Sequence, residues 1–223
     1  MIDKSKVVEL SAPCAATKKL CSNLSQGLHA AAQPLTILRA SLFKGSTDRM
    51  TRDELRGLAA RSAIEVERVC ALFGCLQQLV HIESIKPQLS ATPILPLLMH
   101  AADGVSLLYE RDGMRLCSML PDNCEPVLID SERTLRALSS VLLVAHTISR
   151  KLETIELIAS SSRAVRVVVR NATSYVDTMN AQASLSMALA EADIRSQGAV
   201  FSWSPQPFIV QMEFQKAILC THD

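Results

Sequence analysis

The side chains best suited to chemistry in this 223-residue sequence lie in one stretch, QGLHAAAQPLTILRASL, which spans residues 26–42. His29 carries an imidazole, whose neutral form is a competent nucleophile. Gln33 follows four residues later, and on a helix this spacing places its amide directly above the ring. The pair predicts a nucleophilic group on a helix surface that could accept a transferred group.

The helix that would carry His29 has an apolar stripe with coiled-coil spacing. His29 follows Leu28 on the stripe, so it lies about 100° around the helix, at the edge of the stripe. Gly27 and Pro34 disfavour a helix, by roughly 1 kcal/mol and up to about 3 kcal/mol respectively. Two helix-disfavouring residues so close to His29 indicate that this part of the helix has a function besides packing. The stripe consists of Leu24, Leu28, Ala31, Leu35, Leu38 and Leu42.

A second helix is expected after the break KGSTDRMT. Thr51, followed three residues later by Glu54, resembles a capping box at its start, and Pro87 ends the pattern. Two long helices with a short connection form an antiparallel hairpin, so residues 1–88 predict one helical domain. The apolar stripe of the second helix consists of Leu55, Leu58, Val66, Val69, Phe73, Leu76 and Val80.

A single hairpin would leave half of each stripe in water. Burying one leucine is worth roughly 1.5–3 kcal/mol, and pairing two hairpins into a four-helix bundle would bury the rest. We therefore expect a homodimer that forms through residues 17–85.

Residues 89–223 have a different pattern, in which short alternating segments separate helices. Helices are expected over PILPLLMHAADGVSLLYERDG, over SERTLRALSSVLLVAHTISR with Asp130 as its cap, and over SLSMALAEADIRSQG. Strands are expected over MRLCSML, PVLID, TIELIAS, AVRVVVR, AVFSW and FIVQMEF. The predicted fold class is α+β, with a helical hairpin followed by an α/β sandwich whose helices cover one face of a mixed sheet.

Composition excludes several classes of function. The formal net charge is +1 and aromatic residues make up 4%, which argues against a nucleic-acid-binding surface. Seven cysteines form no CxxC pair and no zinc-like cluster, as expected of reduced thiols in a cytosol. No stretch resembles a signal peptide or a membrane span, so we expect a cytoplasmic protein with no membrane partner.

The motif His29-Ala-Ala-Ala-Gln33-Pro34-Leu35-Thr36 resembles the H-box of sensor histidine kinases, in which the phosphoaccepting histidine precedes Pro-Leu-Thr by five residues. The order of predicted elements is similar to that of a kinase dimerisation domain followed by its ATP-binding domain. The resemblance covers nearly the whole chain, and it implies a role in a bacterial two-component system.

The sequence departs from that family where the family binds nucleotide. The long helix has Val141, Val144 and Ala145 where the kinases carry asparagines that hold magnesium and nucleotide. NATSYVDTMN stands in place of the glycine-rich turn that reads adenine, and no glycine-rich lid follows. Ala30 replaces the acidic residue that usually follows the histidine. We therefore expect no ATP binding, no autokinase activity and no bound cofactor or metal.

A phosphoacceptor without a nucleotide pocket resembles the histidine phosphotransferases of multistep phosphorelays. The resemblance implies that His29 takes a phosphoryl group from one receiver-domain aspartate and gives it to another. The receiver would bring its own aspartate and magnesium. We expect the receiver to dock on the exposed flank of the bundle, at Gly27, Ala30, Gln33, Pro34 and Arg39.

Two alternatives stay open. The chain could be a non-catalytic pseudokinase that binds a receiver or a kinase as a scaffold or inhibitor. It could also be a phosphatase of a response regulator, because the resemblance implies that an amide near Gln33 can align water on the partner's phosphoaspartate.

Overall fold

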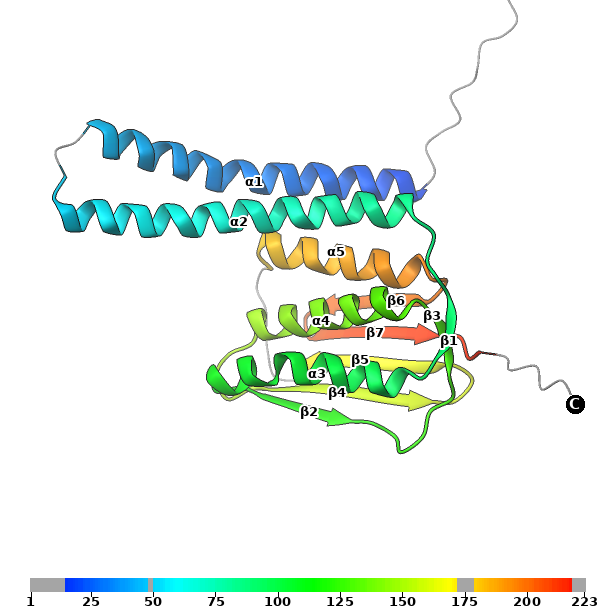
Figure 1. The fold of residues 1–223 in the computed structure, drawn as a ribbon. Coiled ribbons are helices and arrows are strands. Elements are labelled where there is room, and N and C mark those ends of the chain that lie inside the picture. The colour runs from blue at the N-terminus through cyan, green and yellow to red at the C-terminus, as the bar shows by residue number, and fades with distance from the viewer. Residues whose placement is uncertain (1–14, 48–49, 172–178, 218–223) are drawn as a thin grey trace, which may run out of the picture.

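The structure is a computed structural model that describes residues 15–47, 50–171 and 179–217. Its N-terminal part is an antiparallel hairpin of two long helices, α1 (Ala15–Thr47) and α2 (Arg52–Ser84) (Figure 1). α1 continues through Pro34 without a break. The predicted hairpin is therefore confirmed.

The predicted capping box at the start of α2 is also confirmed. The Thr51 N–H donates to Glu54 Oε2 at 2.8 Å, and Thr51 Oγ accepts the Glu54 N–H at 3.4 Å. The bond from the Thr51 N–H, together with a bond from the Thr51 hydroxyl to the same carboxylate, holds the pKa of Glu54 below its ordinary value. Two backbone donors at the helix start are thus satisfied locally, which fixes where α2 begins.

The second part of the chain is an α/β sandwich, as the sequence predicts. Its sheet has the strand order β2-β4-β5-β7-β6, in which β2 runs parallel to β4 and the other neighbours are antiparallel. A separate two-stranded ladder joins β1 to β3. The elements are β1 (Ser90–Thr92), α3 (Ile94–Arg111), β2 (Arg115–Met119), β3 (Val127–Ile129), α4 (Ser131–Ile148), β4 (Thr154–Ser161), β5 (Val165–Asn171), α5 (Ala181–Arg195), β6 (Val200–Pro205) and β7 (Phe208–Phe214).

Helices α3, α4 and α5 cover one face of this sheet (Figure 1). Each central strand sends alternate side chains into the core, as Val165, Val167 and Val169 do on β5. α4 supplies Val141 and Leu142 to the same core and is capped as predicted, because the Asp130 carboxylate accepts the Arg133 N–H at 3.1 Å. The short strand β1 is an element that the sequence analysis did not predict.

α5 connects the two parts of the molecule, because it lies between the hairpin and the sheet (Figure 1). One side of α5 contributes Met187 and Ile194 to the core of the sandwich. The opposite side sends Leu185 and Leu189 into a second apolar cluster with the hairpin. The hairpin residues of that cluster are Ala31, Leu72, Leu76, Leu79 and Ile82. A helix that is apolar on two faces is buried on two faces, and the hairpin therefore rests directly on α5.

Candidate functional site

His29 is exposed on α1, on the side of the hairpin that faces the start of α5. It borders a hollow of about 490 Å³, which we call the His29 groove. Gln33 lies one helical turn further along the same face and borders the same groove. The structure thus brings the two predicted chemical groups together. The remaining lining residues are Gln26, Ala30, Ala32, Thr36 and Ala181.

A smaller hollow of about 260 Å³ adjoins the groove and shares Ala30, Gln33 and Ala181 with it. Its far side is formed by α2, where the Arg68 guanidinium lies 3.1 Å from the Glu65 carboxylate. The groove and this hollow together run across α1 from α5 to α2. Three helices, α1, α2 and α5, therefore border the surface beside the imidazole.

The start of α5 forms the wall of both hollows. Asn180 caps this helix by accepting the Ala183 N–H at 2.7 Å, which fixes where the helix begins. On α2, burial against α5 raises the pKa of the Cys75 thiol above its ordinary value. A hydrogen bond with the side chain of Ser186 on α5 offsets part of this effect. The wall beside His29 is therefore set by how α5 packs on the hairpin.

Two of the predicted partner-binding residues, Gly27 and Pro34, are buried. A Cβ atom added to Gly27 would lie 2.5 Å from Leu76 Cδ2, so this glycine permits the close approach of α1 and α2. Helix packing accounts for Gly27, whereas Pro34 also borders the smaller hollow. Ala30 is half-buried between the two hollows, and Arg39 is exposed on α1 beyond the residues that line them.

The residues that stand in place of nucleotide ligands all lie in the sandwich core. Val141 and Ala145 are fully buried and Val144 is 3% exposed. Residues 172–178, which carry most of the predicted substitute for the adenine-reading turn, lie outside the described residues. Within the described ranges, no group of three or more His, Cys, Asp or Glu side chains is placed to hold a metal ion.

Sequence reasoning did not include Gln26, Thr36 or Ala181 in the site. Thr36 belongs to the quoted H-box motif, and its hydroxyl donates to the Ala32 carbonyl at 2.8 Å, so the motif itself could have drawn attention to it. Ala181 gave no signal, because its place beside His29 depends on packing between elements about 150 residues apart along the chain.

Across the described residues, no helix is long and apolar enough to cross a bilayer.

Comparison by sequence gives no match, either to a family model or to a curated protein. Comparison by structure gives clear likenesses. The histidine kinase AdeS of Acinetobacter baumannii has a TM-score of 0.68 at 16% identity, over 84% of this chain and 98% of that one. Full-length ShkA, solved with AMPPNP, has a TM-score of 0.55 at 16% identity, over 90% of this chain and 46% of that one. A histidine kinase of Burkholderia phymatum STM815 has a TM-score of 0.50 at 18% identity, over 86% of this chain and 98% of that one.

These likenesses define the class of fold. The chain has a histidine-kinase-like fold, with a helical hairpin followed by an ATPase-like α/β domain. The resemblance inferred from the H-box and the order of elements is confirmed at this level.

Proposed function

We propose that the chain is a histidine phosphotransferase of a two-component phosphorelay that works without ATP. An unprotonated ring nitrogen of His29 forms a bond to phosphorus as the bond between phosphorus and the aspartyl oxygen breaks. The aspartate leaves as a carboxylate and keeps the electron pair of that bond. The reverse step delivers the phosphoryl group to the aspartate of a second receiver.

The observation that carries this proposal is the placement of His29. Its ring is exposed at an open groove of about 490 Å³, and Gln33 borders the same groove. A histidine that served only to pack the hairpin would be expected among the buried residues of the α1–α2 contact, such as Ala31 and Leu72.

The absence of ATP chemistry is supported by the side chains of α4. Nucleotide-bound magnesium needs oxygen ligands, and Val141, Val144 and Ala145 are apolar and packed in the core. The receiver would therefore supply the aspartate and the magnesium, while this chain supplies the position of the imidazole. Calorimetry with ATP and magnesium should give no binding heat, and micromolar affinity would contradict this part of the proposal.

A homodimer is supported by the exposed half of each apolar stripe. Alternate members of the stripe face the α1–α2 contact, while the others are exposed, which is the pattern expected of a hairpin that pairs with a second copy. Complete burial of such a side chain is worth roughly 1.5–3 kcal/mol, and each of the seven exposed side chains, which are already partly covered, would gain a part of that amount. They are Leu28, Leu35 and Leu42 on α1, and Leu55, Val66, Phe73 and Val80 on α2.

A phosphatase of a response regulator is the second candidate, and the position of Gln33 favours it. Its side chain borders both hollows, so its amide could hold a water near a phosphoaspartate docked over His29. In that reaction water attacks the phosphorus, the bond between phosphorus and the aspartyl oxygen breaks, and the aspartate leaves as a carboxylate. The products are the free aspartate and inorganic phosphate, and the imidazole is never labelled. A non-catalytic scaffold would use the same surface without either reaction.

The test is transfer of ³²P from receiver domains labelled with acetyl [³²P]phosphate. We expect an acid-labile, alkali-stable label on the wild-type chain and loss of that label in His29→Ala. His100→Ala is the matched control, because His100 is an exposed histidine of α3. Label retained in His29→Ala would refute the proposal, and faster loss of receiver phosphate without any labelled chain would favour the phosphatase.

A further inference from the structure

The linker between α2 and β1, residues 85–89, passes between two hollows. One, of about 510 Å³, lies between the linker and the start of α4, and the other, of about 680 Å³, lies between the linker, the hairpin and α5. Ile85 and Lys86 border both. Since hollows flank these two residues, apolar packing contributes little to holding them in place. Specific polar bonds must do so.

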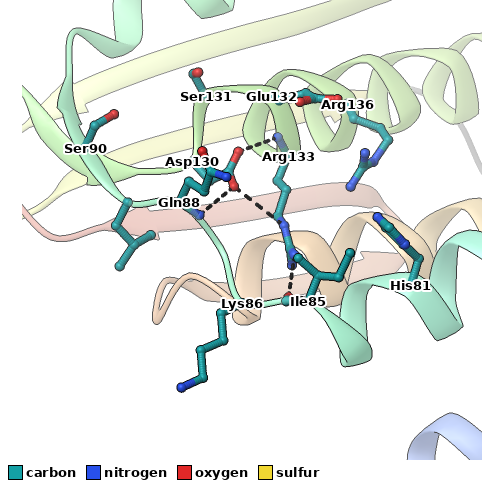
Figure 2. Close-up of a pocket in the computed structure, with 11 residues that line it drawn as sticks. His81, Ile85, Lys86, Gln88, Ser90, Asp130, Ser131, Glu132, Arg133 and Arg136 are labelled. Carbon is teal, nitrogen blue, oxygen red and sulfur yellow. Dashed lines mark hydrogen bonds and ion pairs between the residues drawn. The ribbon is translucent and has the colours of Figure 1, made fainter.

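Arg133, in the first turn of α4, makes those bonds (Figure 2). Its Nη2 donates to the Ile85 carbonyl at 2.6 Å, and its Nη1 donates to Ser196 Oγ at 3.0 Å. Its Nε lies 3.7 Å from Asp130 Oδ2 in an ion pair. The side chain is only 7% exposed. One guanidinium therefore contacts the linker, α4 and the end of α5 at once.

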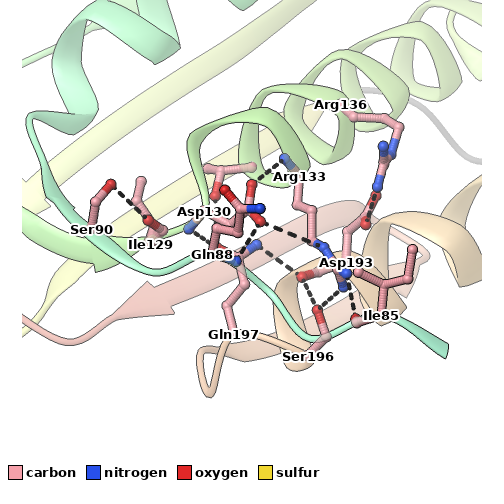
Figure 3. Close-up of polar contacts among 11 residues, drawn as sticks. Ile85, Gln88, Ser90, Ile129, Asp130, Arg133, Arg136, Asp193, Ser196 and Gln197 are labelled. Carbon is pink, nitrogen blue, oxygen red and sulfur yellow. Dashed lines mark hydrogen bonds and ion pairs between the residues drawn. The ribbon is translucent and has the colours of Figure 1, made fainter. Parts of the chain in front are cut away.

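Neighbouring residues complete the same network (Figure 3). Asp130 Oδ2 accepts the Gln88 N–H at 2.9 Å, which ties a second linker residue to the start of α4. Gln197 Oε1 accepts the Asp130 N–H at 2.7 Å, and Gln197 Nε2 donates to the Asp193 carbonyl at 2.8 Å. We call this set, Ile85, Gln88, Asp130, Arg133, Ser196 and Gln197, the linker junction.

The bonds of the linker junction tie the linker to α4 and α5. Each nitrogen of the Arg133 guanidinium lies near a protein oxygen, two in hydrogen bonds and the third in an ion pair, so the protein itself holds this group in place. A buried guanidinium stabilises a fold only when it is paired in this way. Its removal would leave the Ile85 carbonyl without that donor and would break the bridge from the linker to Ser196 at the end of α5, while the Gln88–Asp130 bond to the start of α4 would remain.

The junction is connected to the candidate site through α5. The junction holds the C-terminal end of this helix at Ser196, and its N-terminal end forms the wall of the His29 groove at Ala181. Fifteen residues of helix span about 22 Å, and a helix transmits a displacement of one end to the other as a rigid element. The shape of the groove therefore depends on a residue that is remote from His29.

We propose that Arg133 is a positioning residue for docking at His29. By joining the linker to the ends of α4 and α5, it fixes the hairpin against the α/β domain and so keeps the wall of the groove in place for the receiver. This proposal rests on the proposed phosphotransfer function. Its structural part, that Arg133 holds the linker, can be tested without any transfer.

The experiment compares Arg133→Met with Arg136→Met in the whole chain. Arg136 lies three residues further along α4 and pairs with the buried Asp193 of α5 at 2.5 Å, without bonding the linker. Both variants remove one guanidinium from one helix and disturb the α4–α5 contact. Only Arg133→Met should raise hydrogen exchange in residues 85–90, while exchange in β5 stays as in the wild type. Only Arg133→Met should raise KM for the phosphorylated receiver, by about tenfold, with kcat within about twofold of the wild type.

The possible outcomes separate the alternatives. Unchanged exchange in the linker of Arg133→Met overturns the proposal. Faster exchange with unchanged KM shows that the linker does not position the groove, and it also overturns the proposal. A lower kcat at unchanged KM, or the same KM rise in Arg136→Met, indicates general destabilisation of the domain. Either result also overturns the proposal. If the wild type transfers no phosphate to any receiver tested, the proposed function fails, and exchange at the linker and at residues 181–184 alone then decides whether Arg133 holds α5.

Discussion

His29 and Gln33 lie one turn apart on the exposed face of α1 and border a single groove. This relationship is more informative than either residue alone, because an exposed histidine or an exposed glutamine is common on a helix. Their common groove is bordered by Ala181 of α5, an element of the other part of the molecule. The chemical groups therefore come from the hairpin, while the space around them is defined by the α/β domain.

Gly27→Ala should destabilise the protein, although alanine favours helices. The new methyl group would lie 2.5 Å from Leu76 Cδ2, so the buried Leu76 would have to shift. Overpacking of this kind costs about 1–3 kcal/mol, which exceeds the gain of about 0.5–1 kcal/mol from replacing a helical glycine. Urea unfolding followed by circular dichroism measures the difference.

Gly104→Ala is the control for this substitution, because no atom lies within 4 Å of its added Cβ on α3. There the helix preference acts alone, and stability should rise by about 0.5–1 kcal/mol. If both variants gain stability, α1 and α2 are not in the close contact that the structure shows at Gly27.

Leu35→Glu combined with Val66→Glu should convert the expected dimer to a monomer. Both side chains are 47% exposed on the outer stripe of the hairpin, where a second copy would bury them. Burying an unpaired carboxylate is strongly unfavourable, whereas burying the apolar side chain that it replaces is favourable. Analytical ultracentrifugation measures the change in mass. Leu107→Glu, at a side chain that is 78% exposed on α3, should leave the mass unchanged, and a wild-type chain that sediments as a monomer would contradict the dimer.

The capping box predicts how the stability of α2 depends on pH. The Thr51 backbone and hydroxyl bonds hold the pKa of Glu54 below its ordinary value of 4.5. A carboxyl whose pKa is lower in the folded state stabilises that state above the unfolded pKa, and the benefit is lost as pH falls through the folded pKa. Glu54→Gln can keep the capping geometry without the charge. The melting temperature of the wild type should therefore exceed that of Glu54→Gln at pH 6, and the difference should be smaller at pH 3, because the carboxyl is protonated as the pH falls through its lowered pKa. An equal difference at both pH values would show that the charge is not involved.

The sequence predicts those features that depend on residues close together along the chain. The Thr51–Glu54 capping box, the Asp130 cap and the strands predicted at 154–160 and 164–170 are local patterns, and each is present, the strands as β4 and β5. His29 and Gln33 were also identified locally, because helical periodicity fixes which side chains share a face. The buried state of Gly27 was not foreseen, because it depends on where Leu76 of the other helix lies.

Contacts between distant segments were missed for the same reason. Leu185 and Leu189 point away from Met187 and Ile194 on α5, and this two-sided apolar pattern is the one signal that α5 is buried against two partners. Arg133 gave no signal, since an arginine in the first turn of an amphipathic helix is ordinarily solvent-exposed. Only the folded chain brings the Ile85 carbonyl to its guanidinium.

Gln33→Ala should separate phosphotransfer from hydrolysis, since the two reactions need different groups at the groove. Transfer to His29 needs the ring nitrogen and room for the receiver, and removing an exposed amide that shares the groove changes neither, so labelling of the chain should fall by less than about threefold. Hydrolysis needs a water held beside the phosphoaspartate, so any acceleration of receiver dephosphorylation should fall by about 10²-fold or more when the aligning amide is lost. Release of inorganic phosphate and label on the chain can be followed in one reaction, with His29→Ala in parallel. If Gln33→Ala abolishes labelling as completely as His29→Ala, the amide is required for transfer itself. The two residues would then have to be treated as one catalytic unit and not as the centres of two alternative reactions.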